Sequence, residues 1–234
     1  MTIKAVFFDV GQTILSPAPD GVAFCTAARQ FGFELSSAEV LAQTPAMYRR
    51  YEQHYQADSS FWDDDARAKA VWLDAYGLLY QLLGLGDQAD AAALWAFEFY
   101  FNPGAWSVYS DVDKTLVELS GRGLMLGLIS NWDSSLRPII EGLGMADRFE
   151  TIIASTEVGL HKPDAAIFRL ALDRLGVTAE EALHVGDHLQ ADVQGALGAG
   201  LHAVLLDRAD RHPEFGAAPR LTGLDGLAEL IDGM

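Results

Sequence analysis

The sequence predicts an α/β fold with a parallel β-sheet that is interrupted after its first strand by an all-helical segment. Three observations predict it. Short apolar runs alternate with segments of helical periodicity over most of the 234 residues, as in a parallel sheet with crossover helices. From Gly21 to Phe101 only helical periodicity is present. Polar residues follow directly on the apolar runs, where open α/β sheets place their sites.

The first strand is expected at Ile3–Phe8, a short apolar run that suits a strand buried on both faces. The segment Ser16-Pro17-Ala18-Pro19 is typical of a hinge at the start of an insert, because prolines interrupt regular structure. Residues 1–16 and 105–234 are therefore predicted to form the α/β core, and residues 17–104 a helical domain inserted into it.

Within the insert, Ser36 followed by Glu39 predicts a helix start, because these two side chains can cap the first turn together. A long helix is expected over 63–83, where apolar residues recur at helical spacing until a pair of glycines. Another helix is expected over 87–99. Asn102-Pro103-Gly104 then marks the return to the core.

Beyond the insert, strand-like and helix-like segments alternate to the end of the chain. Four further strands are expected at Leu124–Ile129, Phe149–Ala154, Ala182–Val185 and Ala203–Leu206. Helical spacing predicts helices over 111–120, 134–143, 164–175, 191–197 and 224–231.

The composition limits the partners that the chain can have. A formal net charge of −17 argues against nucleic acid, because backbone phosphates need clustered lysine and arginine. No uninterrupted apolar stretch reaches the roughly 18 residues of a membrane span. The single cysteine, Cys25, fits a reducing compartment, so a cytoplasmic protein is expected. The expected partner is a small molecule, and monomer and homodimer both stay open.

Chemically useful side chains follow the expected strands. Asp9 follows the first strand, Ser130 the second and Asp187 the fourth, while Lys162 lies beyond the third and Asp192 beyond Asp187. A carboxylate nucleophile can split a phosphoryl transfer into two easier steps. Clustered acids need a hard divalent cation beside them. A lysine and a hydroxyl would then neutralise and orient the phosphoryl oxygens.

These segments resemble the four motifs of the haloacid dehalogenase superfamily, in the same order along the chain: Asp9 to Thr13, Ser130-Asn131, Lys162-Pro163, and Gly186-Asp187 with Asp192. The core and the insert resemble the Rossmann-like core and the type 1 helical cap of that family, over essentially the whole chain. The resemblance implies a Mg²⁺-dependent hydrolase, and first of all a phosphatase of small phosphomonoesters that forms an aspartyl phosphate on Asp9.

The resemblance also implies roles for single residues. Asp9 is the expected nucleophile, Lys162 the cation that bridges it to the phosphate, and Thr13 the residue that braces the first loop. The expected substrate-binding residues lie in the same loops: Ser130, Asn131 (mainly through its backbone N–H), Gly11 and Gln12. The expected magnesium ligands all offer oxygen: Asp9, the backbone carbonyl of Gly11, Asp187 and, in a supporting position, Asp192.

The first motif departs from most phosphatases of the family, which carry a second aspartate two residues after the nucleophile. This chain has Gly11 there, so the general acid and base is missing. The residues Ser130-Asn131-Trp132-Asp133 fit a subclass with this feature. Four other side chains of the motif loops are candidates to take the place of the missing acid, and an ordinary capping or loop role is favoured for each: Asp133, His161, His188 and Gln12. Of these, His161 or Asp133 could relay a proton, because imidazole and carboxylate groups both serve.

Three alternatives stay open. The 2-haloacid dehalogenases of the superfamily also lack the second aspartate, but they need no metal, and this chain keeps Asp187 and Asp192. Phosphonate-cleaving members use a cap lysine, and Lys69 is the one lysine of the expected cap. A catalytically weak binding or regulatory protein would explain Gly11.

The expected cap is rich in aromatic residues, and packing of a small helical domain is expected to explain most of them. They are Tyr48, Tyr51, Tyr55, Phe61, Trp62, Trp72, Tyr76, Tyr80, Trp95, Phe97, Phe99, Tyr100 and Phe101.

Overall fold

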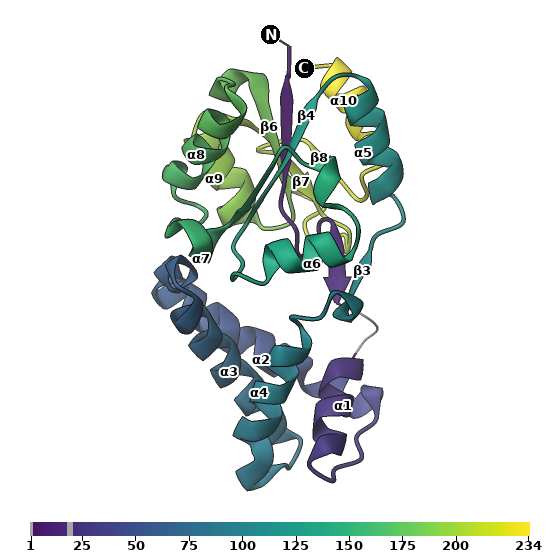
Figure 1. Ribbon diagram of the computed structural model, residues 1–234, viewed down its shortest axis with the longest axis vertical. Coiled ribbons are helices and arrows are strands. Elements are labelled where there is room, and N and C mark those ends of the chain that lie inside the picture. Colours follow the sequence, from purple (N-terminus) through teal and green to yellow (C-terminus); the bar gives the residue numbers. More distant parts are fainter. Residues whose placement is uncertain (1, 18–20) are drawn as a thin grey trace.

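The computed structural model describes residues 2–17 and 21–234. Six strands form one sheet in the order β5-β4-β1-β6-β7-β8, and every neighbouring pair is parallel (Figure 1). The α/β fold with a parallel sheet is therefore confirmed. The strands are β1 (Ala5–Phe8), β4 (Met125–Ser130), β5 (Thr151–Ala154), β6 (Ala182–Gly186), β7 (His202–Leu206) and β8 (Arg220–Leu221).

Alternate residues of β1 enter two different hydrophobic cores, one on each face of the sheet. Val6 and Phe8 belong to one core, and Ala5 and Phe7 to the other. Because β1 is buried on both faces, its sequence is continuously apolar. The first core is covered by α5 (Val112–Gly121), α6 (Leu136–Gly142) and α10 (Leu227–Asp232), and the second by α8 (Ala165–Leu175) and α9 (Gly195–Gly198).

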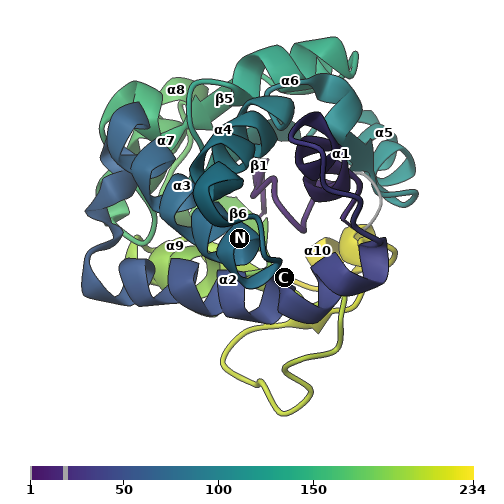
Figure 2. The ribbon, with the colours of Figure 1, turned by 90° about the horizontal axis from the view of Figure 1, so that it is seen from below.

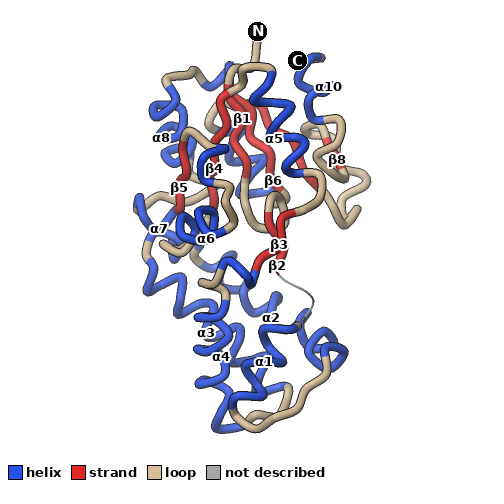
Figure 3. Tube along the Cα trace, turned by 45° about the vertical axis from the view of Figure 1, so that its right-hand side comes forward, coloured by secondary structure: helices blue, strands red, loops and turns tan. Residues whose placement is uncertain are grey.

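A group of helices forms the other half of the molecule, and Figure 3 shows no strand among them. Ser36 and Glu39 cap the start of α2 as expected, since the Ser36 hydroxyl accepts from the Glu39 N–H at 3.3 Å and the Glu39 carboxylate accepts from the Ser36 N–H at 2.8 Å. The helices are α1 (Val22–Gln30), α2 (Ser37–Ala57), α3 (Asp65–Leu82) and α4 (Ala89–Phe99), and they share a hydrophobic core of their own.

Two short strands, β2 (Leu15–Pro17) and β3 (Trp106–Val108), pair antiparallel where the chain passes between the sheet and the helical half. The two connections therefore lie side by side. Pro17 ends β2, whereas Ala18 and Pro19 of the expected hinge lie outside the described residues. The division into a core of 1–16 and 105–234 and a cap of 17–104 stays a prediction.

Several elements differ from expectation. The helix expected over 191–197 begins earlier, as a π-helical turn at Leu189–Gln194 that continues into α9. This turn lets the Asp192 carboxylate accept from the His188 N–H at 2.8 Å. The elements that were not expected are too short to show periodicity: β2, β3, β8 and α7 (Ser155–Val158).

The helices α1 to α4 lie over the ends of the central strands. Seen from the helical end, β1 and β6 lie behind the middle of the group, with the four helices around them (Figure 2). Both chain termini lie at the opposite end of the sheet (Figure 1). Within the described residues, no helix is both long and apolar enough to cross a bilayer.

Candidate active site

The carboxyl ends of β4, β1 and β6 lie next to one another, and each is followed by a polar side chain. Asp9 follows β1, Ser130 ends β4 and Asp187 follows β6. A cavity of about 320 Å³ separates this edge from the helical half. It is lined by most of the residues singled out from the sequence: Asp9, Gly11, Gln12, Ser130, Asn131, Lys162, Asp187 and Asp192.

Lys162 connects the nucleophile position to a second acid. It is 1% exposed, and its ammonium donates to the carboxylates of Asp9 at 2.7 Å and Asp192 at 2.6 Å. Burial alone would lower the pKa of Lys162, but the charges of Asp192 and Asp9 together raise it. The Lys162 side chain therefore stays positively charged where it lines the cavity, between Asp9 and Asp192.

Ser130 also donates to Asp9, to the same oxygen Oδ1, at 3.0 Å. The hydroxyl expected to bind phosphate thus also holds the Asp9 carboxylate. Lys162 and Ser130 both donate to Oδ1 of Asp9. The other carboxylate oxygen, Oδ2, accepts no hydrogen bond from the described residues.

Asp192 is held from several directions. Its Oδ1 receives hydrogen bonds from Lys162 and lies 3.0 Å from Nε2 of His184, and its Oδ2 accepts from the His188 N–H. Burial favours a higher pKa for Asp192, but Lys162 and His184 hold it well below its usual range. Burial has the opposite effect on His184 and lowers its pKa, because the charged ring is disfavoured. We therefore assign a neutral ring whose Nε2–H donates to Asp192. His184 carries no functional signal in the sequence, because a histidine inside a buried strand also fits an ordinary core position.

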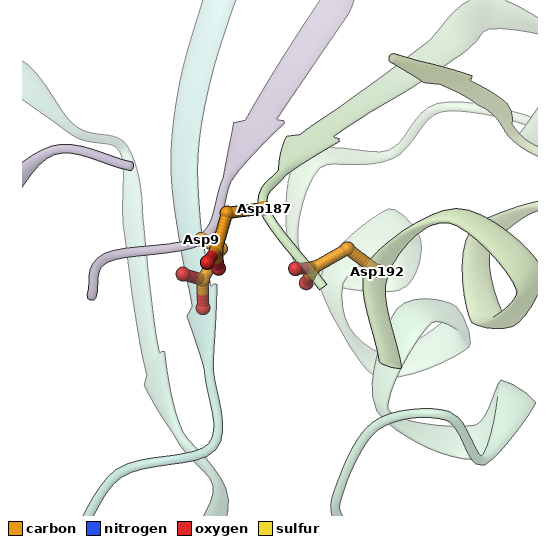
Figure 4. A group of neighbouring side chains, drawn as sticks. All are labelled: Asp9, Asp187 and Asp192. Atoms are coloured by element: carbon orange, nitrogen blue, oxygen red, sulfur yellow. The ribbon is translucent and has the colours of Figure 1, made fainter. Parts of the chain in front are cut away.

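Asp187 is the third acid of the site, and Figure 4 shows its carboxylate beside that of Asp9, with Asp192 directed toward both. One carboxylate oxygen from each residue lies within 4.8 Å of the others. Burial, together with the charges of Asp9 and Asp192, raises the pKa of Asp187 to about 8, although Arg211 opposes the shift. The third carboxylate of the cluster therefore ionises less readily than an ordinary aspartate, and the all-oxygen donor set fits a hard cation such as Mg²⁺, which would favour the ionised form.

The side chain of Asn131 makes contacts that were not expected. Its side-chain amide donates to the Lys162 carbonyl at 2.9 Å and accepts from the Lys162 N–H at 2.8 Å. The side chain, and not only the backbone N–H, thus links the loop after β4 to the loop that carries the lysine. Lys162 lies four residues beyond the end of α7 at Val158 and outside any regular element, so these hydrogen bonds help to hold the loop that carries it.

Thr13, expected among the catalytic residues, does not line the cavity. Its side chain is fully buried, and its hydroxyl has no hydrogen-bond partner among the described residues. Its carbonyl accepts from Arg208 at 2.9 Å, so its contact with the neighbouring loops is made by the backbone. The structure therefore gives no contact between the Thr13 side chain and the reacting groups.

The four proton-relay candidates separate into two groups. Asp133, His188 and Gln12 line the cavity. His161 does not; it lies 3.1 Å from the Ser59 hydroxyl and 2.7 Å from the Asp63 carboxylate. It therefore joins the loop before Lys162 to the helical half, which agrees with the structural role favoured for it.

The aromatic residues of the helical half pack largely into two hydrophobic clusters, as expected, but packing is not their whole role. Most of them line the cavity as well as packing against one another: Tyr48, Tyr51, Tyr55, Trp62, Trp72, Tyr76, Phe97, Tyr100 and Phe101. Helical periodicity shows that a face is apolar, but not whether the face meets a neighbouring helix or an open space.

Comparisons with known proteins agree with this geometry. The model of a family described as haloacid dehalogenase-like hydrolase matches residues 3–200. Haloacid dehalogenase-like hydrolase domain-containing protein 3 of Danio rerio is 34% identical, over 89% of this chain and 86% of its own. A phosphoserine phosphatase of Thermus thermophilus is 31% identical, over 94% of both chains.

Two solved structures share the fold over 99% of this chain and 99% of their own. One is a HAD phosphatase from Thermococcus onnurineus, with 27% identity and a TM-score of 0.67. The other is a 2-haloacid dehalogenase from Pseudomonas syringae, with 26% identity and a TM-score of 0.66. The same fold thus carries both phosphorus and carbon–halogen chemistry among its relatives.

Proposed function

The chain belongs to the haloacid dehalogenase-like hydrolase family, and from this we propose that it is a Mg²⁺-dependent phosphatase of small phosphomonoesters, acting through an aspartyl phosphate on Asp9. The observation that carries the proposal is the cluster of three carboxylates around a single lysine. Burial and the charges of Asp9 and Asp192 oppose the ionisation of Asp187, and Lys162 is already shared by those two acids. A divalent cation would favour the ionised form of Asp187 beside Asp9.

Asp9 and Asp187 are the residues proposed to hold the ion, with the Gly11 carbonyl as a further ligand. Asp192 is proposed to act mainly by holding Lys162, because both of its oxygens already accept hydrogen bonds. Bound there, magnesium would offset charge on the phosphoryl oxygens.

The proposed first step is attack on phosphorus by the Asp9 oxygen that neither Lys162 nor Ser130 engages. A bond forms between this oxygen and phosphorus as the ester oxygen leaves with the bonding electron pair. Lys162 keeps the carboxylate ionised and oriented. Water then attacks the phosphorus of the aspartyl phosphate, which releases inorganic phosphate and restores Asp9.

Hydrolysis of an aryl phosphate tests this proposal, because an aryl oxide leaves without needing a proton. We expect turnover of p-nitrophenyl phosphate in Mg²⁺ and a loss of about 10²-fold or more when a chelator removes the ion. Release of p-nitrophenolate measures it. Equal rates with Mg²⁺ and with chelator would contradict the proposed metal dependence.

A 2-haloacid dehalogenase is the second candidate, favoured by Gly11 and by the likeness to the Pseudomonas syringae enzyme. Carbon–halogen cleavage needs no acid for its leaving group, so Gly11 would be no defect. The added acid Asp187 beside Asp9 speaks for the phosphatase. Halide release from 2-chloropropionate, assayed with the same protein, separates the two. Phosphonate cleavage is less well supported, since Lys69 does not line the cavity and lies 5.5 Å from the Phe97 ring centre.

Replacing Gly11 by aspartate is expected to raise turnover of an alkyl phosphate by about 10²-fold, the lower end of what a positioned acid contributes. The site has room for it, since a Cβ at Gly11 would meet only the Trp132 ring, at 3.6 Å. The gain should be smaller for an aryl phosphate. Gly11→Asn, which is similar in size but has no proton to give, is the control. No gain for Gly11→Asp would favour the binding or regulatory alternative.

A further inference from the structure

One side of the cavity is closed by a continuous series of aromatic rings that begins at the catalytic edge. The His188 ring, after β6, contacts Tyr55 at 5.2 Å between ring centres. Tyr55 stacks on Tyr51 at 6.3 Å, and Tyr51 on Trp72 at 4.6 Å with an angle of 15° between the planes. Trp72 continues to Tyr76 at 5.4 Å.

The series returns to the catalytic edge on the other side. Tyr76 contacts Tyr100 at 6.3 Å, and Tyr100 contacts Trp106 at 5.5 Å. Trp106 contacts Trp132 at 4.7 Å, and Trp132 follows β4. Every ring of this series, here called the aromatic arc, lines the cavity. The arc therefore spans the space above Asp9 from the loop after β6 to the loop after β4.

The charges of the cavity are unfavourable for a substrate with a second anionic group. Among the described residues that line the cavity, Lys162 is the single lysine and no arginine occurs. Lys162 is already shared between Asp9 and Asp192. Arg211 lies outside the lining residues, and it is largely exposed and paired with Asp187 at 3.4 Å. A carboxylate or second phosphate would therefore meet no unpaired lysine or arginine among the described residues of this space.

One donor in the cavity has no partner. The Tyr55 hydroxyl is buried without a hydrogen bond among the described residues. Burial and the charge of Asp192 raise the pKa of Tyr55 to about 12, so the group remains protonated.

We infer that the preferred substrates are phosphomonoesters whose leaving group carries an uncharged aromatic ring, which the aromatic arc receives. This inference rests on the proposed phosphatase function. Stacking on the rings of the aromatic arc favours such a group, and the described lining of the cavity offers no unpaired lysine or arginine to an anionic one.

The test compares two alkyl phosphates with primary alkoxide leaving groups, benzyl phosphate and carboxymethyl phosphate. We expect kcat/KM in Mg²⁺ to be at least about 10-fold higher for benzyl phosphate. Equal values, or a preference for carboxymethyl phosphate, would overturn the inference. If neither ester nor p-nitrophenyl phosphate is hydrolysed, the phosphatase proposal fails. Calorimetric binding of both esters to the Asp9→Asn variant then decides whether the cavity still prefers the ring.

Variants of two aromatic residues that line the cavity, here called wall variants, test whether the preference depends on this lining: Trp72, which belongs to the arc, and Tyr48, which does not. Trp72→Leu is expected to lower kcat/KM for benzyl phosphate about 5- to 10-fold and to leave carboxymethyl phosphate unchanged. The matched control is Trp95→Leu, since Trp95 lies in the same helical half but does not line the cavity. Tyr48→Ala is a second wall variant with little risk to folding, because Tyr48 lines the cavity and is 49% exposed. Equal losses for both esters in both wall variants would show a structural effect and contradict the inference.

Discussion

Asp9→Asn is expected to abolish turnover, with a loss on the order of 10⁴-fold or more, as found when a nucleophile that acts as part of a unit is removed. The amide cannot form the acyl phosphate and carries no charge for Lys162. Folding should be retained, because Lys162 keeps its hydrogen bond to Asp192 at 2.6 Å. Steady-state rates of p-nitrophenyl phosphate hydrolysis and thermal unfolding midpoints measure the two effects.

The control for this variant is Asp147→Asn, which makes the same change at an exposed aspartate of the helix at Ala146–Arg148. It should match the unmodified protein in both assays. Turnover by Asp9→Asn within about tenfold of the unmodified protein would exclude Asp9 as the nucleophile. If Asp9→Asn does not fold, its activity cannot test the role of Asp9, and the Lys162→Met variant then provides the test of the site.

Lys162→Met is expected to reduce turnover by about 10³–10⁵-fold, the effect of removing a cation that stabilises the transition state. It is also expected to destabilise the fold by about 3–5 kcal/mol at neutral pH, because it leaves Asp192 buried without its charged partner. Methionine is similar in length and apolar, so packing changes little. Denaturant unfolding with a chelator present measures the stability.

The destabilisation by Lys162→Met should depend on pH. In the unmodified protein the lowered pKa of Asp192 contributes stability that is present above the unfolded pKa, near 4, and is lost as pH falls. Without the lysine, burial dominates and raises the pKa of Asp192, so ionisation opposes folding as pH rises. The difference between the two proteins should therefore be larger at pH 8 than at pH 5. Lys69→Met, outside the cavity, is the control, and a pH-independent difference would contradict this account.

Much of the fold could be predicted because long elements carry their own signals. The apolar runs at β1, β4 and β6 and the capping pair Ser36 and Glu39 are local features. The short strands β2 and β3 are not, since their pairing depends on residues about 90 positions apart in the sequence. The π-helical turn before α9 depends on hydrogen bonds of Asp192 that exist only in the folded site.

The candidate site also has a part that the sequence predicts and a part that depends on contacts between distant residues. The proximity of Asp9, Ser130 and Asp187 could be predicted from the sequence, because the carboxyl ends of parallel strands lie at one edge of the sheet. The contacts of Asn131 with Lys162 and of His184 with Asp192 could not, since they join loops and strands through side chains. The aromatic arc was missed for a further reason: its rings come from both halves of the chain.

The tryptophans that line the cavity also determine the intrinsic fluorescence of this protein. The chain has five tryptophans, and Trp62, Trp72, Trp106 and Trp132 line the cavity, which leaves Trp95 outside it. Indole emission responds to the polarity and the quenchers around the ring. The intrinsic fluorescence of the protein is therefore mainly a signal from the cavity, and any molecule that enters it can be followed without a label.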